Sequence, residues 1–195
     1  MDEEKNRLAS VGRLCDIVAR LRGPGGCPWD GAQTHESLKP ACIEEAAEVL
    51  GGIDILRETG RAENLKEELG DLLLQVVFHA QLAKEEGLFS LEDVAQAAAD
   101  KMVRRHPHVF HEPMLDDAGK PLTGWKEIKA QEKKGREWEE DYLPHAFEEA
   151  AALIEQAKKR KGISSYRGQE PRPLRLVKNA RFLPSIINNR LSAKI

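Results

Sequence analysis

Two acidic clusters, each spaced for one face of a helix, constrain this chain more than any other feature. The segments 44–48 (EEAAE) and 67–71 (EELGD) both place carboxylates three residues apart, and residues at that spacing share a helix face. No Lys or Arg lies three or four positions from the central acids, Glu45, Glu48, Glu68 and Asp71. Because like charges at helical spacing repel, a cation from elsewhere must offset them, and a divalent metal ion is the simplest candidate.

The composition is typical of a helical globular protein. The chain has 195 residues, 41% of them hydrophobic and 5% aromatic, enough for one domain with a sizeable core. No apolar run approaches a membrane span, and residues 1–5 lack the hydrophobic stretch of a signal peptide, so we expect no membrane contact. The cysteines, Cys15, Cys27 and Cys42, form no Cys-x-x-Cys pair and indicate reduced thiols of a cytoplasmic protein.

The charge is divided unevenly along the chain. Residues 158–195 contain 11 Lys and Arg and one acid, a net charge of +10, so the total of −3 leaves −13 for residues 1–157. The acidic main part argues against nucleic-acid binding. The basic tail is expected to contact phosphates or an acidic partner.

Hydrophobic periodicity predicts helices joined by short loops. They cover residues 4–21, 34–56, 64–87, 91–105 and about 125–134. Asn64 with Glu67, and Ser90 with Asp93, resemble capping boxes at two helix starts. Without strand-like alternation, the expected fold is an all-α helical bundle.

The domain boundary is expected near residue 135. Residues 1–135 form the predicted domain, and residues 136–195 a linker-like helix and an irregular or poorly ordered basic tail, with no complete second domain. Gly51 and Gly52 interrupt the helix that carries the first acidic cluster. Since glycine weakens a helix, this pair indicates close approach of a substrate or of a neighbouring helix.

If the helices 34–56 and 64–87 pack together, the four central acids converge. Hard carboxylate oxygens suit Mg²⁺, with Mn²⁺ as the alternative ion. A di-iron bundle requires Glu-x-x-His pairs, and no histidine of this chain follows Glu at that spacing. Glu-rich helices are also common as solvated surfaces, but two acid pairs without cationic neighbours favour a metal site.

A cationic group follows at the end of the helix 91–105. Lys101, Arg104 and Arg105 are expected either to bind phosphate oxygens beside the metal or to cap the helix and pair with surface acids. The three nearby histidines, His106, His108 and His111, lack a second ligand cluster, so packing is a better interpretation than zinc binding.

The loop 22–30 offers two further possibilities. Its glycines, at 23, 25 and 26, lack the Gly-Lys-Ser/Thr of a P-loop. Trp29 is expected either to stack on a base or to close the core.

Several separate motifs, in this order, resemble the MazG family of nucleoside triphosphate pyrophosphohydrolases. They are Cys27-Pro28-Trp29-Asp30 with Gln33-Thr34, the two acidic clusters, Arg104-Arg105-His106-Pro107-His108-Val109-Phe110 and Trp125-Lys126-x-Ile128-Lys129. The resemblance implies a helical bundle, usually dimeric, that hydrolyses a nucleoside triphosphate to the monophosphate and pyrophosphate with Mg²⁺. Many members of the family carry two copies of the domain.

By position, the resemblance makes Glu45, Glu48, Glu68 and Asp71 metal ligands and places Lys101 and Arg104 at the phosphates. Glu48 and Glu44 are the expected catalytic carboxylates, Glu44 as a base or a supporting residue. Two alternatives remain: a narrower substrate, such as a pyrimidine deoxynucleotide or phosphoribosyl-ATP, or a catalytically silent helical module that binds a nucleotide or a partner.

Overall fold

The computed structural model describes residues 2–111, 113–122 and 124–163. Within these ranges the chain is helical, and its one β-type feature is an isolated bridge between Leu115 and Pro121. This confirms the all-α prediction. The predicted irregular basic tail falls largely on residues 164–195, outside the described residues. No helix in the described ranges has the length and apolar character needed to cross a bilayer.

Within the described residues all five predicted helices are present, together with four short or late ones. The helices are α1 (Asp2–Arg22), α2 (Pro28–Gly31), α3 (Lys39–Thr59), α4 (Glu63–Glu85), α5 (Leu91–Arg105), α6 (Pro107–Phe110), α7 (Trp125–Lys133), the 3-10 helix η1 (Glu137–Tyr142) and α8 (Leu143–Arg160). The Ser90–Asp93 capping box is confirmed at the start of α5. The predicted cap at Asn64 is wrong, because α4 begins at Glu63 and Asn64 lies inside it.

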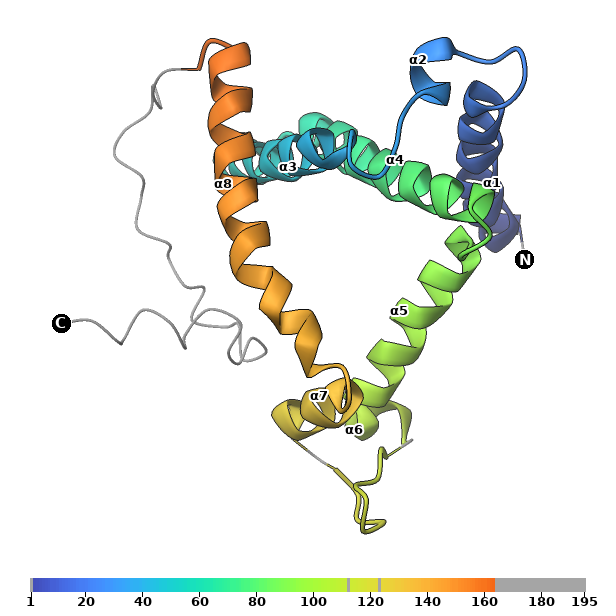
Figure 1. The fold of residues 1–195 in the computed structure, drawn as a ribbon, viewed down its shortest axis with the longest axis vertical. Helices are drawn as coiled ribbons and strands as arrows, with labels where there is room; N and C mark the ends of the chain where they lie inside the picture. The colour runs from blue at the N-terminus through green and yellow to red at the C-terminus, as the bar shows by residue number, and fades with distance from the viewer. Residues whose placement is uncertain (1, 112, 123, 164–195) are drawn as a thin grey trace, which may run out of the picture.

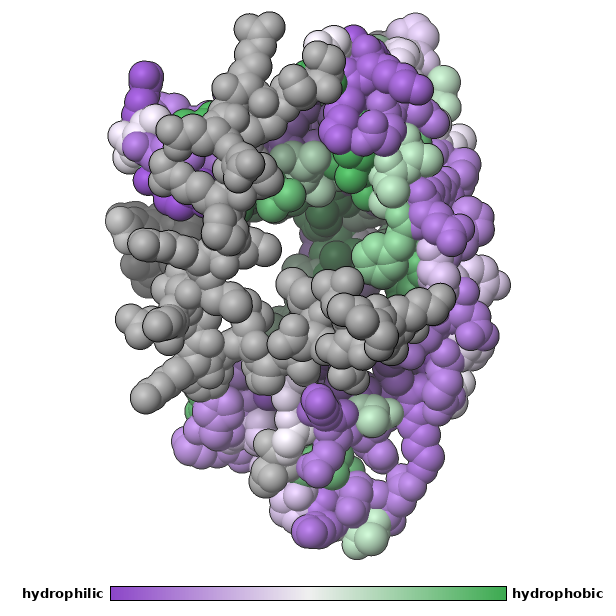
Figure 2. Space-filling view, turned by 90° about the vertical axis from the view of Figure 1, so that its left-hand side faces the viewer, coloured by the Kyte–Doolittle hydropathy of each residue, from purple (hydrophilic) through white to green (hydrophobic). Residues whose placement is uncertain are grey.

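The helices outline an open triangular frame (Figure 1). α3 and α4 form a hairpin along one side, and α1 packs against the far part of α4. From there α5 leads away to α6 and α7 at the opposite corner, and α8 returns to pack on α3. In the space-filling view, hydrophobic side chains gather in the upper centre of one face (Figure 2). Several large apolar side chains of the α3–α4 hairpin, among them Leu50 and Leu69, are exposed in the single chain.

The buried core lies where α1 meets α4. Its members come from α1, α4 and the turn before α3: Val18, Leu38, Val77, Phe78 and Leu82. Leu14, Cys15, Leu74 and Leu91 pack around them. This core fixes α4, which carries the second acidic cluster, against the N-terminal helix.

Arg22 fastens the loop before α3 to this core. Its guanidinium donates to the Glu85 carboxylate (2.8 Å) and to the backbone carbonyls of Asp30 (2.7 Å) and Gln33 (3.1 Å). Gly26 in the same loop lies so close to α1 that an added Cβ would be 2.2 Å from the Leu21 carbonyl oxygen. Gly26 therefore serves chain packing, in agreement with the absence of a P-loop motif.

Gly52 sets how closely α3 approaches α4. A Cβ at this buried position would lie 2.9 Å from Cα of Leu65, whereas one at Gly51 would meet nothing within 4 Å. Of the two predicted reasons for the glycine pair, close approach of a neighbouring helix is the one the structure supports, and it applies to Gly52. The two acidic clusters lie next to this contact, one on α3 and one on α4.

This difference gives a matched pair of variants. We expect Gly52→Ala to lower the free energy of unfolding by about 1–3 kcal/mol, because the methyl group forces the two backbones apart. Gly51→Ala should raise it by up to about 1 kcal/mol, since alanine is the better helix former. Urea denaturation followed by circular dichroism measures both, and equal stability of the two variants would contradict the close contact.

Candidate metal centre

Three of the four predicted metal ligands come together between α3 and α4. Glu45, Glu48 and Glu68 each offer a carboxylate oxygen, and these oxygens lie within 4.8 Å of one another. Among the residues that the structure describes, this is the one group of three acidic, histidine or cysteine side chains with metal-binding geometry. Asp71 is not a member of the group, although it lies on the same face of α4.

Glu68 is the most buried of these ligands. It is 9% exposed, and the Asn64 side-chain amide donates a hydrogen bond of 2.8 Å to its Oε1. Asn64 also borders the contact at Gly52. It was missed as a site residue because it was interpreted as a helix cap, although its spacing of four residues before Glu68 places it on the same helix face.

The electrostatics of Glu45 indicate that the cluster needs a cation. Burial raises the pKa of its carboxyl, and the negative charges of Glu48, Asp71, Glu44 and Glu68 raise it further. Several carboxylates in a partly buried site cannot all ionise without a counter-charge. Hard oxygen donors of this kind fit Mg²⁺ or Mn²⁺, so the residues present match the expected ion.

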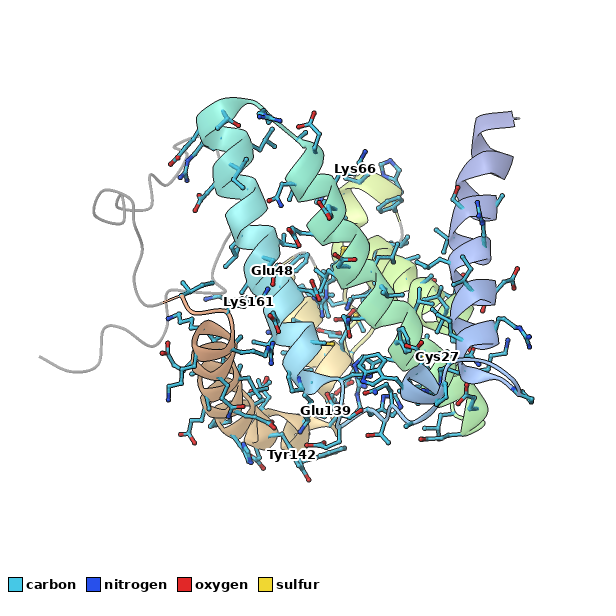
Figure 3. The ribbon with its side chains drawn as sticks, turned by 90° about the horizontal axis from the view of Figure 1, so that it is seen from above. Cys27, Glu48, Lys66, Glu139, Tyr142 and Lys161 are labelled. Carbon is cyan, nitrogen blue, oxygen red and sulfur yellow. The ribbon has the colours of Figure 1, made fainter. Side chains whose placement is uncertain are left out.

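Two of the acids already have cationic partners from the end of α8. Arg160 and Lys161 form ion pairs with Glu44, and Lys161 also pairs with Glu48 (Figure 3). The hydrogen bond from Lys161 lowers the pKa of the Glu44 carboxyl. The prediction that cations must come from outside the two helices is therefore confirmed for Glu44 and Glu48, but in this structure the cations are side chains of α8.

The polar face of α4 continues past the acids. The Oε1 atom of Gln75 is buried without a hydrogen-bond partner, one turn after Asp71. Beyond it, His79 Nδ1 lies 2.7 Å from His35 Nδ1, and His79 Nε2 lies 3.3 Å from the Cys42 sulfur. The prediction did not include these residues as a site, because the pairs join segments far apart in sequence.

Burial favours the neutral forms of Cys42 and His79. It raises the pKa of the Cys42 thiol, with a further contribution from Glu45. It lowers the pKa of the His79 imidazole, with a further contribution from His35. A thiolate–imidazolium pair is disfavoured, so the group extends the hydrogen bonding of the hairpin and is not an activated nucleophile.

The predicted phosphate-binding cations lie far from the carboxylates within one chain. They sit at the end of α5 near α7, at the opposite corner of the frame (Figure 1). The Glu132 carboxylate accepts hydrogen bonds from Arg105 (2.6 Å) and Arg104 (3.3 Å), and the Arg105 guanidinium lies 5.0 Å from the centre of the Trp125 ring. Lys101 is exposed one turn earlier.

Other candidate residues are also placed by the structure. Trp29 is 66% exposed on α2, so the alternative that it closes the core is wrong. His106 contacts the Met102 carbonyl oxygen (2.7 Å) and packs edge-on against Trp125, as the packing interpretation predicts. All three cysteines are free thiols.

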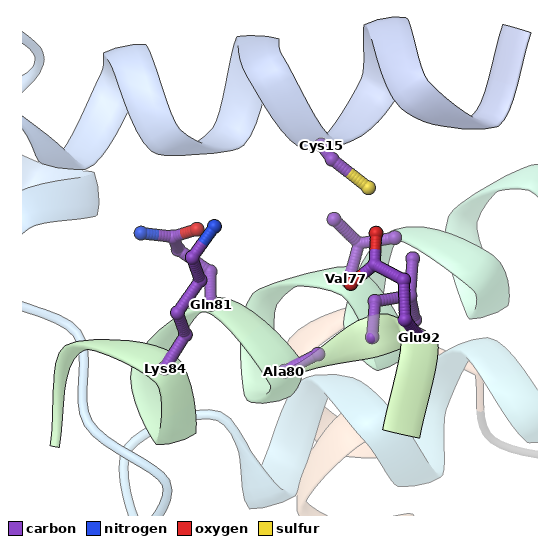
Figure 4. A pocket seen from close by; sticks show the side chains of 7 residues that line it. Cys15, Val77, Ala80, Gln81, Lys84 and Glu92 are labelled. Atoms are coloured by element: carbon purple, nitrogen blue, oxygen red, sulfur yellow. The ribbon is translucent and has the colours of Figure 1, made fainter. Parts of the chain in front are cut away.

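Two further hollows lie outside the acidic cluster. One, of about 50 Å³, lies beside Cys15 between α1, α4 and α5 and is too small for a nucleotide (Figure 4). The other, of about 410 Å³, borders α7, and its walls include Trp125, Lys126, Lys129 and Lys133. Glu137 and Glu140 also line the second hollow, and Glu140 pairs with Lys133, so its lining is of mixed charge.

The acidic cluster lies within a region that matches a known family. Residues 33–110 match the MazG nucleotide pyrophosphohydrolase domain. This segment is a MazG domain. The matched region runs from the turn before α3 to the end of α6, so it includes all four acids and the cationic end of α5.

Proteins similar to this chain occur in several bacteria. The nucleoside triphosphate pyrophosphohydrolase/pyrophosphatase MazG of Thermotoga maritima is 52% identical over 120 residues, 62% of this chain and 44% of that protein. The nucleoside triphosphate pyrophosphohydrolase of Escherichia coli K12 is 46% identical over 127 residues, 65% of this chain and 47% of that protein. The uncharacterized protein YabN of Bacillus subtilis is 45% identical over 135 residues, 69% of this chain and 27% of that protein. The chain thus spans less than half the length of these MazG relatives.

The charge repulsion at Glu45 predicts that Glu45→Gln stabilises the metal-free chain but removes the stabilisation by Mg²⁺. Because the pKa of Glu45 is raised in the fold, its ionisation near neutral pH costs stability, and Glu45→Gln removes that cost. We expect this variant to melt higher than the unsubstituted chain in chelator. Mg²⁺ at roughly a hundredfold excess over its dissociation constant should stabilise the unsubstituted chain by about 2.7 kcal/mol and so raise its melting temperature. The melting temperature of the variant should not change with Mg²⁺.

The control is Glu67→Gln, which removes an exposed acid next to the cluster. It should respond to Mg²⁺ as the unsubstituted chain does. A Glu45→Gln variant that kept the full Mg²⁺ response in differential scanning fluorimetry would show that the ion binds elsewhere.

Proposed function

We propose that the protein hydrolyses nucleoside triphosphates at the α–β bond, with Mg²⁺, to the monophosphate and pyrophosphate. The observation that carries this proposal is the convergence of Glu45, Glu48 and Glu68 inside a MazG domain. The names of the Thermotoga and Escherichia relatives support the same activity. We further propose residues 1–135 as the catalytic unit and the removal of aberrant nucleotides from nucleotide pools as its role. We also propose a cytoplasmic location, which the free thiols support.

Each residue has a proposed task. Glu45, Glu48 and Glu68, with Asp71 nearby, would hold the divalent ion. Once bound, such an ion neutralises phosphate charge and lowers the pKa of water. Glu44 is proposed to accept the proton of the attacking water, because its carboxylate lies beside that of Glu48, where both contact Lys161. The water oxygen bonds to the α-phosphorus while the bond from this phosphorus to the bridging oxygen breaks, and pyrophosphate leaves.

The substrate-binding residues complete this site only if a second copy of the chain contributes. Lys101, Arg104 and Arg105 are proposed to bind the phosphates, and Trp29 to stack on the base. In one chain the end of α5 points away from the acids (Figure 1). We therefore propose a homodimer in which one copy brings its α5 end to the carboxylates of the other.

Uncovered apolar surface supports the homodimer. Leu69, Leu73 and Val76 form an exposed stripe at helical spacing on α4, and Phe147 of α8 is 73% exposed. Exposed stripes of this kind are typical of protein interfaces. A symmetric pair would cover both copies of the stripe at once.

One observation favours a second candidate function. The ion pairs from Arg160 and Lys161 already neutralise Glu44 and Glu48, as expected of a catalytically silent module that binds a nucleotide or a partner. The basic tail is then the proposed contact for an acidic partner. A narrower substrate, such as a pyrimidine deoxynucleotide or phosphoribosyl-ATP, stays within the leading proposal.

A panel of nucleoside triphosphates, assayed with and without Mg²⁺, tests the function. We expect Mg²⁺-dependent release of pyrophosphate and monophosphate, resolved from orthophosphate by chromatography. Glu48→Gln should abolish turnover while leaving the helical circular dichroism unchanged, because it removes one ligand from a cluster of three. Orthophosphate as the product would refute the bond assignment, and full activity of the variant would refute the site. Calorimetric nucleotide binding without turnover would favour the silent module.

The homodimer has its own test by sedimentation equilibrium. We expect a mass of twice the chain mass of 21.8 kDa. Leu73→Glu should shift the protein to the monomer and reduce hydrolysis with it, because it places a charge in the centre of the stripe. Leu88→Glu, at an exposed position after α4, is the matched control and should stay dimeric. A fully active monomer would contradict the shared site.

A further inference from the structure

The C-terminal end of α8 lies directly on the acidic cluster. Lys161 Nζ contacts the Glu48 carboxylate and lies 2.9 Å from Oε1 of Glu44. Arg160 contacts the other oxygen of Glu44. Figure 3 shows Lys161 beside Glu48, where the end of α8 meets the middle of α3. Two cations of one helix end thus converge on two adjacent acids of another helix.

Glu48 has two competing roles in this arrangement. Its carboxylate belongs to the cluster with Glu45 and Glu68, and the same carboxylate is the partner of Lys161. An ammonium group and a divalent ion on one carboxylate repel each other strongly at such short range. Lys161 and the ion therefore cannot both keep their full contact with Glu48.

We propose that Lys161 is an internal counter-ion of the metal centre, which holds Glu48 in the metal-free chain and is displaced from it when the divalent ion binds. This inference rests on the proposed metal site. Lys161 then keeps Glu44 as its partner, so a cation remains at the edge of the loaded site. Metal loading and the position of the α8 end are coupled through one carboxylate.

The solvent exposure of Lys161 and Glu48 indicates that a metal ion can displace Lys161 from Glu48. The side chains of Lys161 and Glu48 are 40% and 34% exposed, whereas that of Glu44 is 14% exposed. Ion pairs this exposed are weak, and a divalent ion that gains three carboxylates competes with them well.

A second contact keeps the movement local. Lys39 of α3 forms an ion pair with Glu149 of α8 at 3.2 Å, several turns before Lys161. Because this contact uses neither Glu44 nor Glu48, it persists when Lys161 leaves Glu48. The middle of α8 therefore remains on α3 while the Lys161 side chain moves.

The test is Mn²⁺ binding to the full chain without nucleotide, measured from the electron paramagnetic resonance signal of free Mn²⁺. We expect Lys161→Gln to bind Mn²⁺ about two- to fivefold more tightly, the range expected for loss of one exposed ion pair. Lys161→Arg keeps the cation and should bind as the unsubstituted chain does. Lys158→Gln is the matched control, since it makes the same charge change on the same helix, where Lys158 pairs with Glu155.

The outcomes separate this inference from the proposed function. Mn²⁺ binding by Lys161→Gln that is equal to that of Lys158→Gln, or weaker than that of the unsubstituted chain, would overturn the counter-ion role. If the unsubstituted chain bound no Mn²⁺, the metal site and the counter-ion role would fail together. Mn²⁺ binding with the expected Lys161 effect but without triphosphate hydrolysis would refute the proposed activity and leave the counter-ion role standing.

Discussion

The close approach of α3 and α4 is the constraint on which the rest of the structure depends. It places Glu45, Glu48 and Glu68 within reach of one another, where burial and mutual repulsion raise the pKa of Glu45. Gly52 allows this approach, because a side chain there would meet the backbone of α4. The hairpin therefore holds charges that a helix pair selected only for stability would avoid, as expected of a functional site.

α4 reconciles this cost with a stable fold by dividing its length between two tasks. Its N-terminal half carries Glu68 of the acidic cluster and Asn64, which donates to it. Its C-terminal half carries Val77, Phe78 and Leu82, which are buried against α1 and supply the apolar burial that holds the domain together. The exposed stripe Leu69, Leu73 and Val76 lies on another side of the helix. Chemistry and core are thus separated along α4, and the proposed association surface is separated from the acids around it.

The sequence was sufficient for features that depend on local spacing. The order and approximate extent of the main helices, the Ser90 cap and three of the four grouped acids follow from patterns within a few turns, although α3 begins at Lys39 and not at residue 34. It was insufficient for pairs that join distant segments, because spacing along one helix does not say which other helix packs beside it. The contact between Lys161 and Glu48 spans 113 positions, and the pair His35–His79 spans 44. The prediction for Asn64 was wrong for a different reason. Asn is favoured as a helix cap, but its side-chain amide can also donate to another side chain on the same helix face.

The contact of α8 with α3 also closes the triangular frame, since α8 is the last described helix and α3 belongs to its first side (Figure 1). Several charged pairs stand at this junction, Lys39 with Glu149 and the end of α8 with Glu44 and Glu48. Exposed charges are screened beyond a Debye length of about 8 Å at physiological ionic strength and about 3 Å at molar salt. The ring of helices is thus closed by ion pairs between α8 and α3. High salt should weaken this closure while the apolar core of α1 and α4 stays intact.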